Sequence, residues 1–97
     1  MNVVWTESAT SQLQAIRDSA TWKTPGYGLV LSGKIVERSE GLAYQPYLGG
    51  EVPEYGDSTI RELFEHPHRI LYTVVASEVQ ILAVIHAARL LPHTPAG

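Results

Sequence analysis

Two apolar runs in the C-terminal half constrain the fold of this 97-residue chain more than any other feature. They span residues 69–75 and 79–86, and both are rich in β-branched and aromatic side chains. The short polar break between them, at 76–78, is typical of a β-hairpin with one buried face. We therefore predict two antiparallel strands joined by a two-residue turn at Ser77 and Glu78.

That turn would also set the register of the hairpin. Side chains alternate across a strand, so one face would be apolar and the other polar. The expected apolar face comprises Ile70, Tyr72, Val74, Ile81, Ala83 and Ile85. The expected polar face comprises Arg69, Thr73, Gln80 and His86. Arg69 would pair with His86, and Arg89 would lie just beyond them.

The composition is that of one small domain over residues 1–97, with 93–97 as a flexible tail. The chain is 44% hydrophobic and 18% charged, and its formal net charge is −3. A chain of this length buries only a modest core. Its acidic balance is unfavourable for gripping a polyanion, so any nucleic-acid role would need a local basic patch. The absence of cysteine excludes disulfides and thiolate sites.

The same sequence also bears on where the protein would act. No run approaches the roughly 18 apolar residues that a membrane span needs. The N-terminus lacks the basic-then-apolar order of a signal peptide. We therefore expect a cytoplasmic protein with no membrane partner.

The N-terminal half has helical patterns. Residues 3–6 are β-branched and aromatic, which predicts a first strand. Thr6 or Ser8 would cap a helix whose apolar face comprises Ala9, Leu13, Ile16 and Ala20.

A second helix is predicted to start at Thr24 and Pro25. Its apolar stripe comprises Leu31, Ile35 and Leu42. Four glycines between 26 and 41 weaken this helix, so we expect a late start, fraying or close packing against another backbone.

Extended patterns follow the helices. Residues 51–55 predict a short strand in which Pro53 suits an edge or a bulge, and 60–65 predict a longer strand. The order of one strand, two helices and three or four strands predicts an α+β fold. In such a fold the helices cover one face of an antiparallel sheet.

The candidate functional residues are Arg61, Arg69, His86 and Arg89. Arginine offers forked donors to phosphate, and histidine can transfer a proton near neutral pH. The alternative is that Arg61 and Arg69 pair with carboxylates such as Glu62 or Glu65 and only solubilise the surface, which is the commoner outcome for scattered charges.

His66 and His68 form a second candidate. Their spacing could present two metal ligands on one side of an extended segment. No third ligand is near in sequence, and Pro67 suggests a bend between them. We therefore predict neither a metal nor a cofactor.

Three motifs carry a resemblance to a known family. They are Arg-Glu-Leu at 61–63, Arg-Ile-Leu-Tyr at 69–72 and Val-x-Ile-Leu-x-Val-Ile-His-x-Ala-Arg-x-Leu-Pro at 79–92. In order and spacing they resemble the RelE/ParE toxins of type II toxin–antitoxin systems, over nearly the whole chain. The resemblance implies an N-terminal strand, a two-helix hairpin and an antiparallel sheet of three to four strands. It also implies growth arrest, plasmid stabilisation and a cognate antitoxin as partner.

Within this family the resemblance implies two activities. In RelE-like members, basic residues on the sheet bind and cut messenger RNA inside the ribosome. Arg69 and Arg89 would then stabilise charge on the scissile phosphate, and His86 would be the general acid or base. ParE-like members inhibit DNA gyrase without a catalytic site of their own.

We favour the ParE-like interpretation, in which the chain is not an enzyme and the four basic residues bind the target. The protein is acidic and has no tyrosine after Arg89, while Gly50 and Ala87 depart from common family residues. If it were an enzyme, it would be a ribosome-dependent endoribonuclease. A third possibility is a non-toxic member that only binds its antitoxin. The antitoxin would occupy a groove between the helical hairpin and the sheet, together with an exposed sheet edge.

Overall fold

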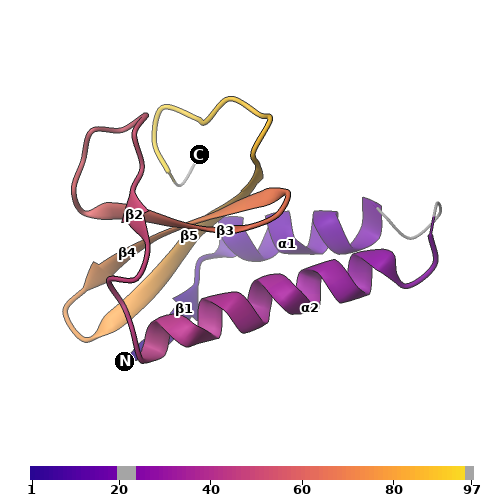
Figure 1. Ribbon diagram of the computed structural model, residues 1–97, viewed down its shortest axis with the longest axis horizontal. Coiled ribbons are helices and arrows are strands. Elements are labelled where there is room, and N and C mark those ends of the chain that lie inside the picture. The colour runs from indigo at the N-terminus through magenta and orange to yellow at the C-terminus, as the bar shows by residue number, and fades with distance from the viewer. Residues whose placement is uncertain (20–23, 96–97) are drawn as a thin grey trace.

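The computed structural model describes residues 1–19 and 24–95, which form one sheet with two helices on one face (Figure 1). Two predictions lie outside these residues, namely the position of Ala20 and the end of the expected tail at 96–97. In chain order the elements are β1 (Asn2–Trp5), α1 (Glu7–Ser19), α2 (Tyr27–Glu40), a 3₁₀ turn (Gly41–Ala43), β2 (Gly50–Glu51), β3 (Ile60–Glu65), β4 (His68–Val75) and β5 (Glu78–His86).

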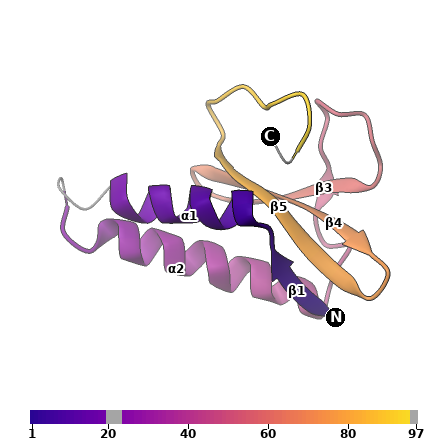
Figure 2. The ribbon, with the colours of Figure 1, turned by 180° about the vertical axis from the view of Figure 1, so that it is seen from behind.

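The five strands lie in the order β1-β5-β4-β3-β2. β1 runs parallel to β5, and the other neighbours are antiparallel. Seen from behind, α1 lies along β5 beside α2 (Figure 2). The predicted α+β fold is confirmed, with the addition that the N-terminal strand completes the sheet as its one parallel member. Within the described residues, no helix is long and apolar enough to cross a membrane.

The β4–β5 register differs from the prediction. Val75 pairs with Glu78, so the turn consists of Ala76, at φ 55°, and Ser77. Near the turn the pairing is shifted by two residues from the predicted one, which leaves each side chain on its predicted face. Leu82 is then an extra residue between the Tyr72–Ile81 and Leu71–Ala83 pairs.

This bulge moves the following residues of β5 to the opposite face. Ala83 and Ile85 therefore lie away from the helices, and Val84 packs on the helix side instead. Arg69 pairs with Ile85, and His86 pairs with His68. The predicted pairing of Arg69 with His86 is wrong.

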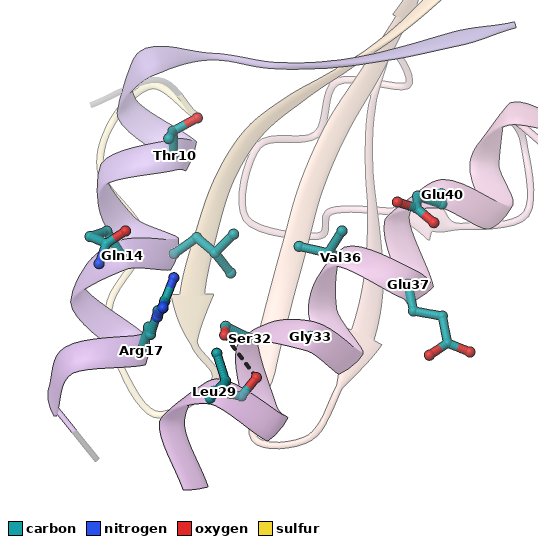
Figure 3. A pocket seen from close by; sticks show the side chains of 10 residues that line it. Thr10, Gln14, Arg17, Leu29, Ser32, Gly33, Val36, Glu37 and Glu40 are labelled. Carbon is teal, nitrogen blue, oxygen red and sulfur yellow. Dashed lines mark hydrogen bonds between the residues drawn. The ribbon is translucent and has the colours of Figure 1, made fainter. Parts of the chain in front are cut away.

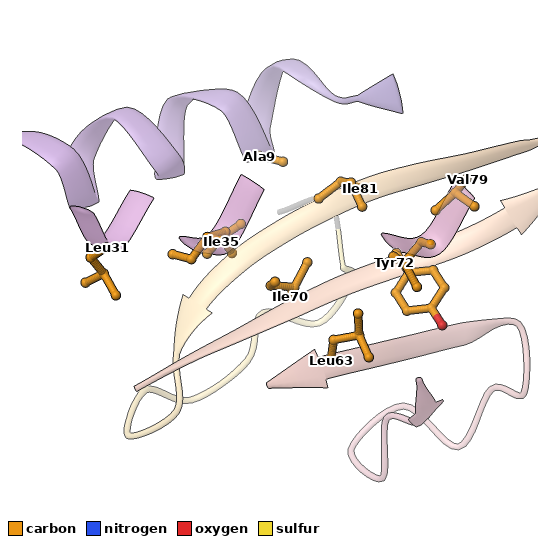
Figure 4. Close-up of a cluster of buried hydrophobic side chains, with 10 residues drawn as sticks. Ala9, Leu31, Ile35, Leu63, Ile70, Tyr72, Val79 and Ile81 are labelled. Atoms are coloured by element: carbon orange, nitrogen blue, oxygen red, sulfur yellow. The ribbon is translucent and has the colours of Figure 1, made fainter. Parts of the chain in front are cut away.

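The main core lies between the sheet and the helices (Figure 4). The predicted stripe is confirmed as buried, with Leu31 and Ile35 in α2 and Leu42 in the 3₁₀ turn that follows it. They pack with buried sheet residues, which are Leu63, Ile70, Tyr72, Val79, Ile81 and Val84. From α1, Ala9 is fully buried, while Leu13 and Ile16 pack at the edge of this core.

A second, smaller core covers the opposite face of the sheet, where the sequence predicted an open polar surface. It comprises Val52, Leu71, Ala83 and Ile85, with Tyr55, Ile60 and Leu91 packed against them. The β2–β3 loop and the C-terminal residues 87–95 fold over this face (Figure 1). They leave the charged residues of this face partly enclosed.

The ends of the helices follow local chemistry. Thr6 caps α1, because its Oγ1 accepts a hydrogen bond from the backbone N–H of Ala9 at 3.1 Å. α2 starts at Tyr27 after Gly26, which has a φ of 84°, so the predicted start at Thr24 is wrong and the expected late start is confirmed. Gly28 lies so close to the backbone carbonyl of Arg17 that a Cβ would not fit, which confirms the expected close packing.

The predicted strand at 51–55 is much shorter in the structure. Only Gly50 and Glu51 pair with β3. The backbone N–H of Val52 still donates to the carbonyl of Ile60 at 3.2 Å, but Pro53 has no N–H with which to continue the ladder. The chain turns there instead. The predicted strand at 60–65 is confirmed with the same bounds.

Candidate functional site

Arg69 is held by two carboxylates on the face of the sheet away from the helices. Its Nε donates to Glu62 Oε1 at 2.6 Å. Its Nη1 and Nη2 form a fork on Glu54, at 2.6 Å and 2.8 Å. The side chains of Arg69 and Glu62 are 9% and 8% exposed, whereas that of Glu54 is 46% exposed. The alternative interpretation, in which Arg69 pairs with carboxylates, therefore describes this residue.

The pKa values of Glu54 and Arg69 are consistent with these hydrogen bonds. The Arg69 hydrogen bonds hold the pKa of Glu54 down at about 2. The same bonds, first to Glu54 and then to Glu62, raise the pKa of Arg69. Glu54 and Arg69 are therefore both charged at neutral pH. A phosphate could reach the Arg69 fork only by displacing Glu54.

Arg61 binds the backbone just before β2, at the edge of the sheet. Its Nη1 donates to the carbonyl of Gly49 at 2.6 Å and to that of Tyr47 at 3.4 Å. The guanidinium carbon also lies 5.1 Å from the centroid of the Tyr47 ring. Because Arg61 pairs with Tyr72, it points to the face opposite Arg69. The two arginines therefore do not meet.

His86 lies on the helix side of the sheet, beside His68. The two ring centroids are 5.4 Å apart, and the rings are nearly perpendicular at 78°. Arg69 points to the other face, so the sheet separates it from His86. Arg89 lines a cavity with both histidines and also lines the rim of a hollow beside Glu54 and Arg69.

His66 and His68 diverge rather than share a side. His66 is exposed and its ring centroid lies 6.2 Å from that of Phe64, whereas His68 is buried against His86. The residues that the structure describes contain no group of three or more His, Cys, Asp or Glu that could hold a metal ion.

A groove runs between α1 and α2, with a volume of about 490 Å³ (Figure 3). Its walls include Leu13 and Val36 together with Leu29, which is 55% exposed. Arg17 and Glu37 add charge along its rim. This groove lies between the two helices, whereas the sequence suggested one between the helical hairpin and the sheet.

The sequence did not reveal the roles of three residues. Glu54 has no local pattern and meets Arg69 only through the β2–β3 loop. His68 was considered only as a partner of His66. Gln12 was not singled out, although its Oε1 accepts a hydrogen bond from the backbone N–H of Val84 at 2.8 Å. The alternation of β4 with its neighbours would have revealed the His68–His86 pair if the bulge had been foreseen.

Comparison with known proteins gives consistent results. A family model described as the ParE toxin of the type II toxin–antitoxin system parDE matches residues 3–91. The fold is similar to a solved chain described as the chromosomal ParDE TA system from P. aeruginosa, with a TM-score of 0.76 and 28% sequence identity. That match covers 89% of this chain and 95% of the other. No curated protein matches the sequence.

Proposed function

Because this chain belongs to the ParE toxin family of type II toxin–antitoxin systems, we propose that it is a toxin that inhibits DNA gyrase by binding and without cutting RNA. Gyrase is the target that the resemblance to ParE-like toxins implies. The observation that carries the proposal is the position of Arg69, which is bound to two carboxylates on the face opposite His86.

The geometry favours binding over RNA cleavage for a chemical reason. The RelE-like arrangement needs Arg69, Arg89 and the proton-transfer group His86 to reach the same phosphate. Here His86 and Arg69 point to opposite faces, and the Arg69 donors are occupied by Glu54 and Glu62. The acidic chain, with its net charge of −3, also lacks the overall charge that favours RNA.

Of the four residues predicted to bind the target, Arg89 is the best placed to do so. Arg61 and Arg69 are tied to groups of this chain. Among the described residues, no hydrogen bond or ion pair holds the exposed Arg89 guanidinium. We propose that Arg89 contacts the target and that Arg61 and Arg69 mainly shape the sheet.

We also propose that a cognate antitoxin neutralises this toxin by covering the groove between α1 and α2. The groove combines exposed apolar side chains such as Leu29 with charges of both signs at Arg17 and Glu37, which suits an amphipathic segment. The chain described as a chromosomal ParDE system provides the precedent for such a pair.

The groove can be tested with a pair of exposed apolar residues. Leu29→Glu would place a charge in the groove and should weaken antitoxin binding at least about tenfold. Tyr44→Glu is the matched control, because Tyr44 is 89% exposed and lies outside the groove. Equal binding by both variants would show that the antitoxin binds elsewhere.

The activity can be tested with two assays on one preparation. The purified chain should inhibit gyrase supercoiling and leave ribosome-bound messenger RNA intact. RNA cleavage on the ribosome with unaffected gyrase would instead establish the RelE-like alternative. Normal growth on expression of the chain alone, with antitoxin binding retained, would identify a non-toxic family member.

A further inference from the structure

A second cavity lies at the end of the β4–β5 hairpin, on the side covered by α1. Its volume is about 310 Å³. Its polar lining consists of Gln12, His68, His86 and Arg89, and the rest of its lining is apolar. No carboxylate lines this cavity within the part of the chain that the structure describes. It is therefore a small site with several potential donors and no negative charge of its own.

Two of the polar groups have their acceptor atoms already occupied. Gln12 Oε1 accepts the backbone N–H of Val84, so its amide NH₂ remains as a donor. His86 Nδ1 accepts the backbone N–H of Ala88 at 3.0 Å, so the neutral ring carries its proton on Nε2. Both side chains are thus left with N–H groups to offer.

His68 completes the set of donors. The residue is 7% exposed, and its Nδ1 is buried without a hydrogen-bond partner in the described structure. A buried N–H without a partner is rarer than an unpaired acceptor, so the proton of the neutral ring belongs on Nε2. Burial lowers the pKa of His68, and the neighbouring His86 and Arg89 lower it further. A negative ligand would reverse that effect.

We propose that this cavity binds the phosphoryl group of a small phosphate compound, through Arg89, His86, His68 and the Gln12 amide. The donors approach from α1, β4 and the end of β5. A tetrahedral oxyanion accepts hydrogen bonds from several directions, whereas a carboxylate accepts in one plane. Arg89, together with His68 once an anion favours its protonation, also matches the double charge of a phosphate. The site lies on the face opposite Arg69. It shares Arg89 with the proposed target contact, but phosphate binding by the chain alone does not require gyrase.

The test is a titration of the purified chain followed by NMR of the histidine rings. The probes are inorganic phosphate, ribose 5-phosphate and acetate. The Cε1–H signals of His68 and His86 should shift saturably with phosphate. We expect a dissociation constant in the millimolar range, which corresponds to a binding free energy of about 4 kcal/mol. The ring pKa of His68 should rise when phosphate is bound. His66 and His93 lie outside the cavity and serve as internal references.

Two variants separate specific binding from a general charge effect. Arg89→Gln should weaken phosphate binding at least about tenfold, because it removes the charge-assisted donor. Arg38→Gln removes an equal charge from an exposed position on α2 and should leave binding unchanged. Both residues are exposed, so neither change should disturb the fold.

The relative affinities for the two phosphate compounds identify the ligand. Tighter binding of ribose 5-phosphate than of inorganic phosphate would support a phosphomonoester as the ligand, and equal binding would support free phosphate. The proposal fails if no saturable shift appears, if Arg89→Gln binds phosphate like the unchanged chain, or if acetate binds as tightly. Gyrase inhibition is not a readout in this test, so the two proposals can fail separately.

Discussion

Replacing Arg69 by alanine should destabilise the fold strongly. The change would leave the carboxylate of Glu62, 8% exposed, without its charged partner. Removal of one partner from a buried ion pair costs about 3–5 kcal/mol. The other carboxylate, Glu54, is 46% exposed, so water screens its part of the interaction and its loss adds little. We therefore expect the low end of that range, about 3 kcal/mol of unfolding free energy.

Two further variants separate the charge from the packing. Glu54→Gln should cost about 1 kcal/mol or less, because that side of the pair is solvated. The double change of Arg69→Met with Glu62→Leu should be nearly neutral, since apolar residues of similar volume often replace a buried ion pair without loss. Urea unfolding at pH 7 measures all three free energies.

The same variants test the role of Arg69 in function. A cost of less than about 1 kcal/mol for Arg69→Ala would refute the structural role, because it would mean that no buried charge is left without a partner. The double variant should still inhibit gyrase. Complete loss of inhibition with the fold intact would mean that Arg69 contacts the target directly.

Three other changes follow from the packing and the charges. Gly28→Ala should destabilise the fold by about 1 kcal/mol or more, because the new Cβ would meet the backbone of α1. Gly33→Ala has open space around it and should stabilise the fold by about 0.5–1 kcal/mol. Thermal melting of the two variants compares these effects. Tyr72→Phe should cost about 1 kcal/mol in urea unfolding, because its hydroxyl accepts a buried backbone N–H at 2.9 Å. The pKa of His68 in the folded chain lies below its ordinary value of 6.5. As the pH falls, the imidazole is therefore protonated in the unfolded chain before it is protonated in the folded one. Stability should be complete above about pH 6.5 and fall below it, with a shallower slope in His68→Gln.

The sequence was sufficient for elements whose signals are local. The spacing of Leu31 and Ile35 identified the buried side of α2, and both are in the core, as is Leu42 in the 3₁₀ turn that follows. The cap of α1 at Thr6 likewise depends on a side chain three residues from its partner. The order and spacing of the motifs pointed to the family that the comparisons identify.

The arrangement of the basic residues could not be predicted in the same way. The faces of β5 depend on one bulged residue, Leu82, and no residue type marks that position in the sequence. The turn formed at Ala76 and Ser77 lacks an Asn-Gly or Asp-Gly signal. A bulge reverses every side chain beyond it, so this single residue separated Arg69 from His86.

The ion pairs of Arg69 depend on tertiary structure. Glu54 lies 15 residues before Arg69 in the chain, in a loop whose path is set by Pro53 and the packing of Val52. Pairing of β3 with β4 brings Glu62 to the same face. Local charge spacing indicated only that some carboxylate would be near.

The proposed inhibition of gyrase by binding can be measured on the purified chain. The most direct measurement is a supercoiling assay in which purified chain is titrated against a fixed amount of gyrase, with ribosome-dependent messenger-RNA cleavage followed in parallel. We predict that inhibition saturates near stoichiometric amounts of the chain and that the RNA stays intact. Cleavage of RNA by amounts of the chain far below the ribosome concentration, with supercoiling unaffected, would contradict the proposed inhibition of gyrase.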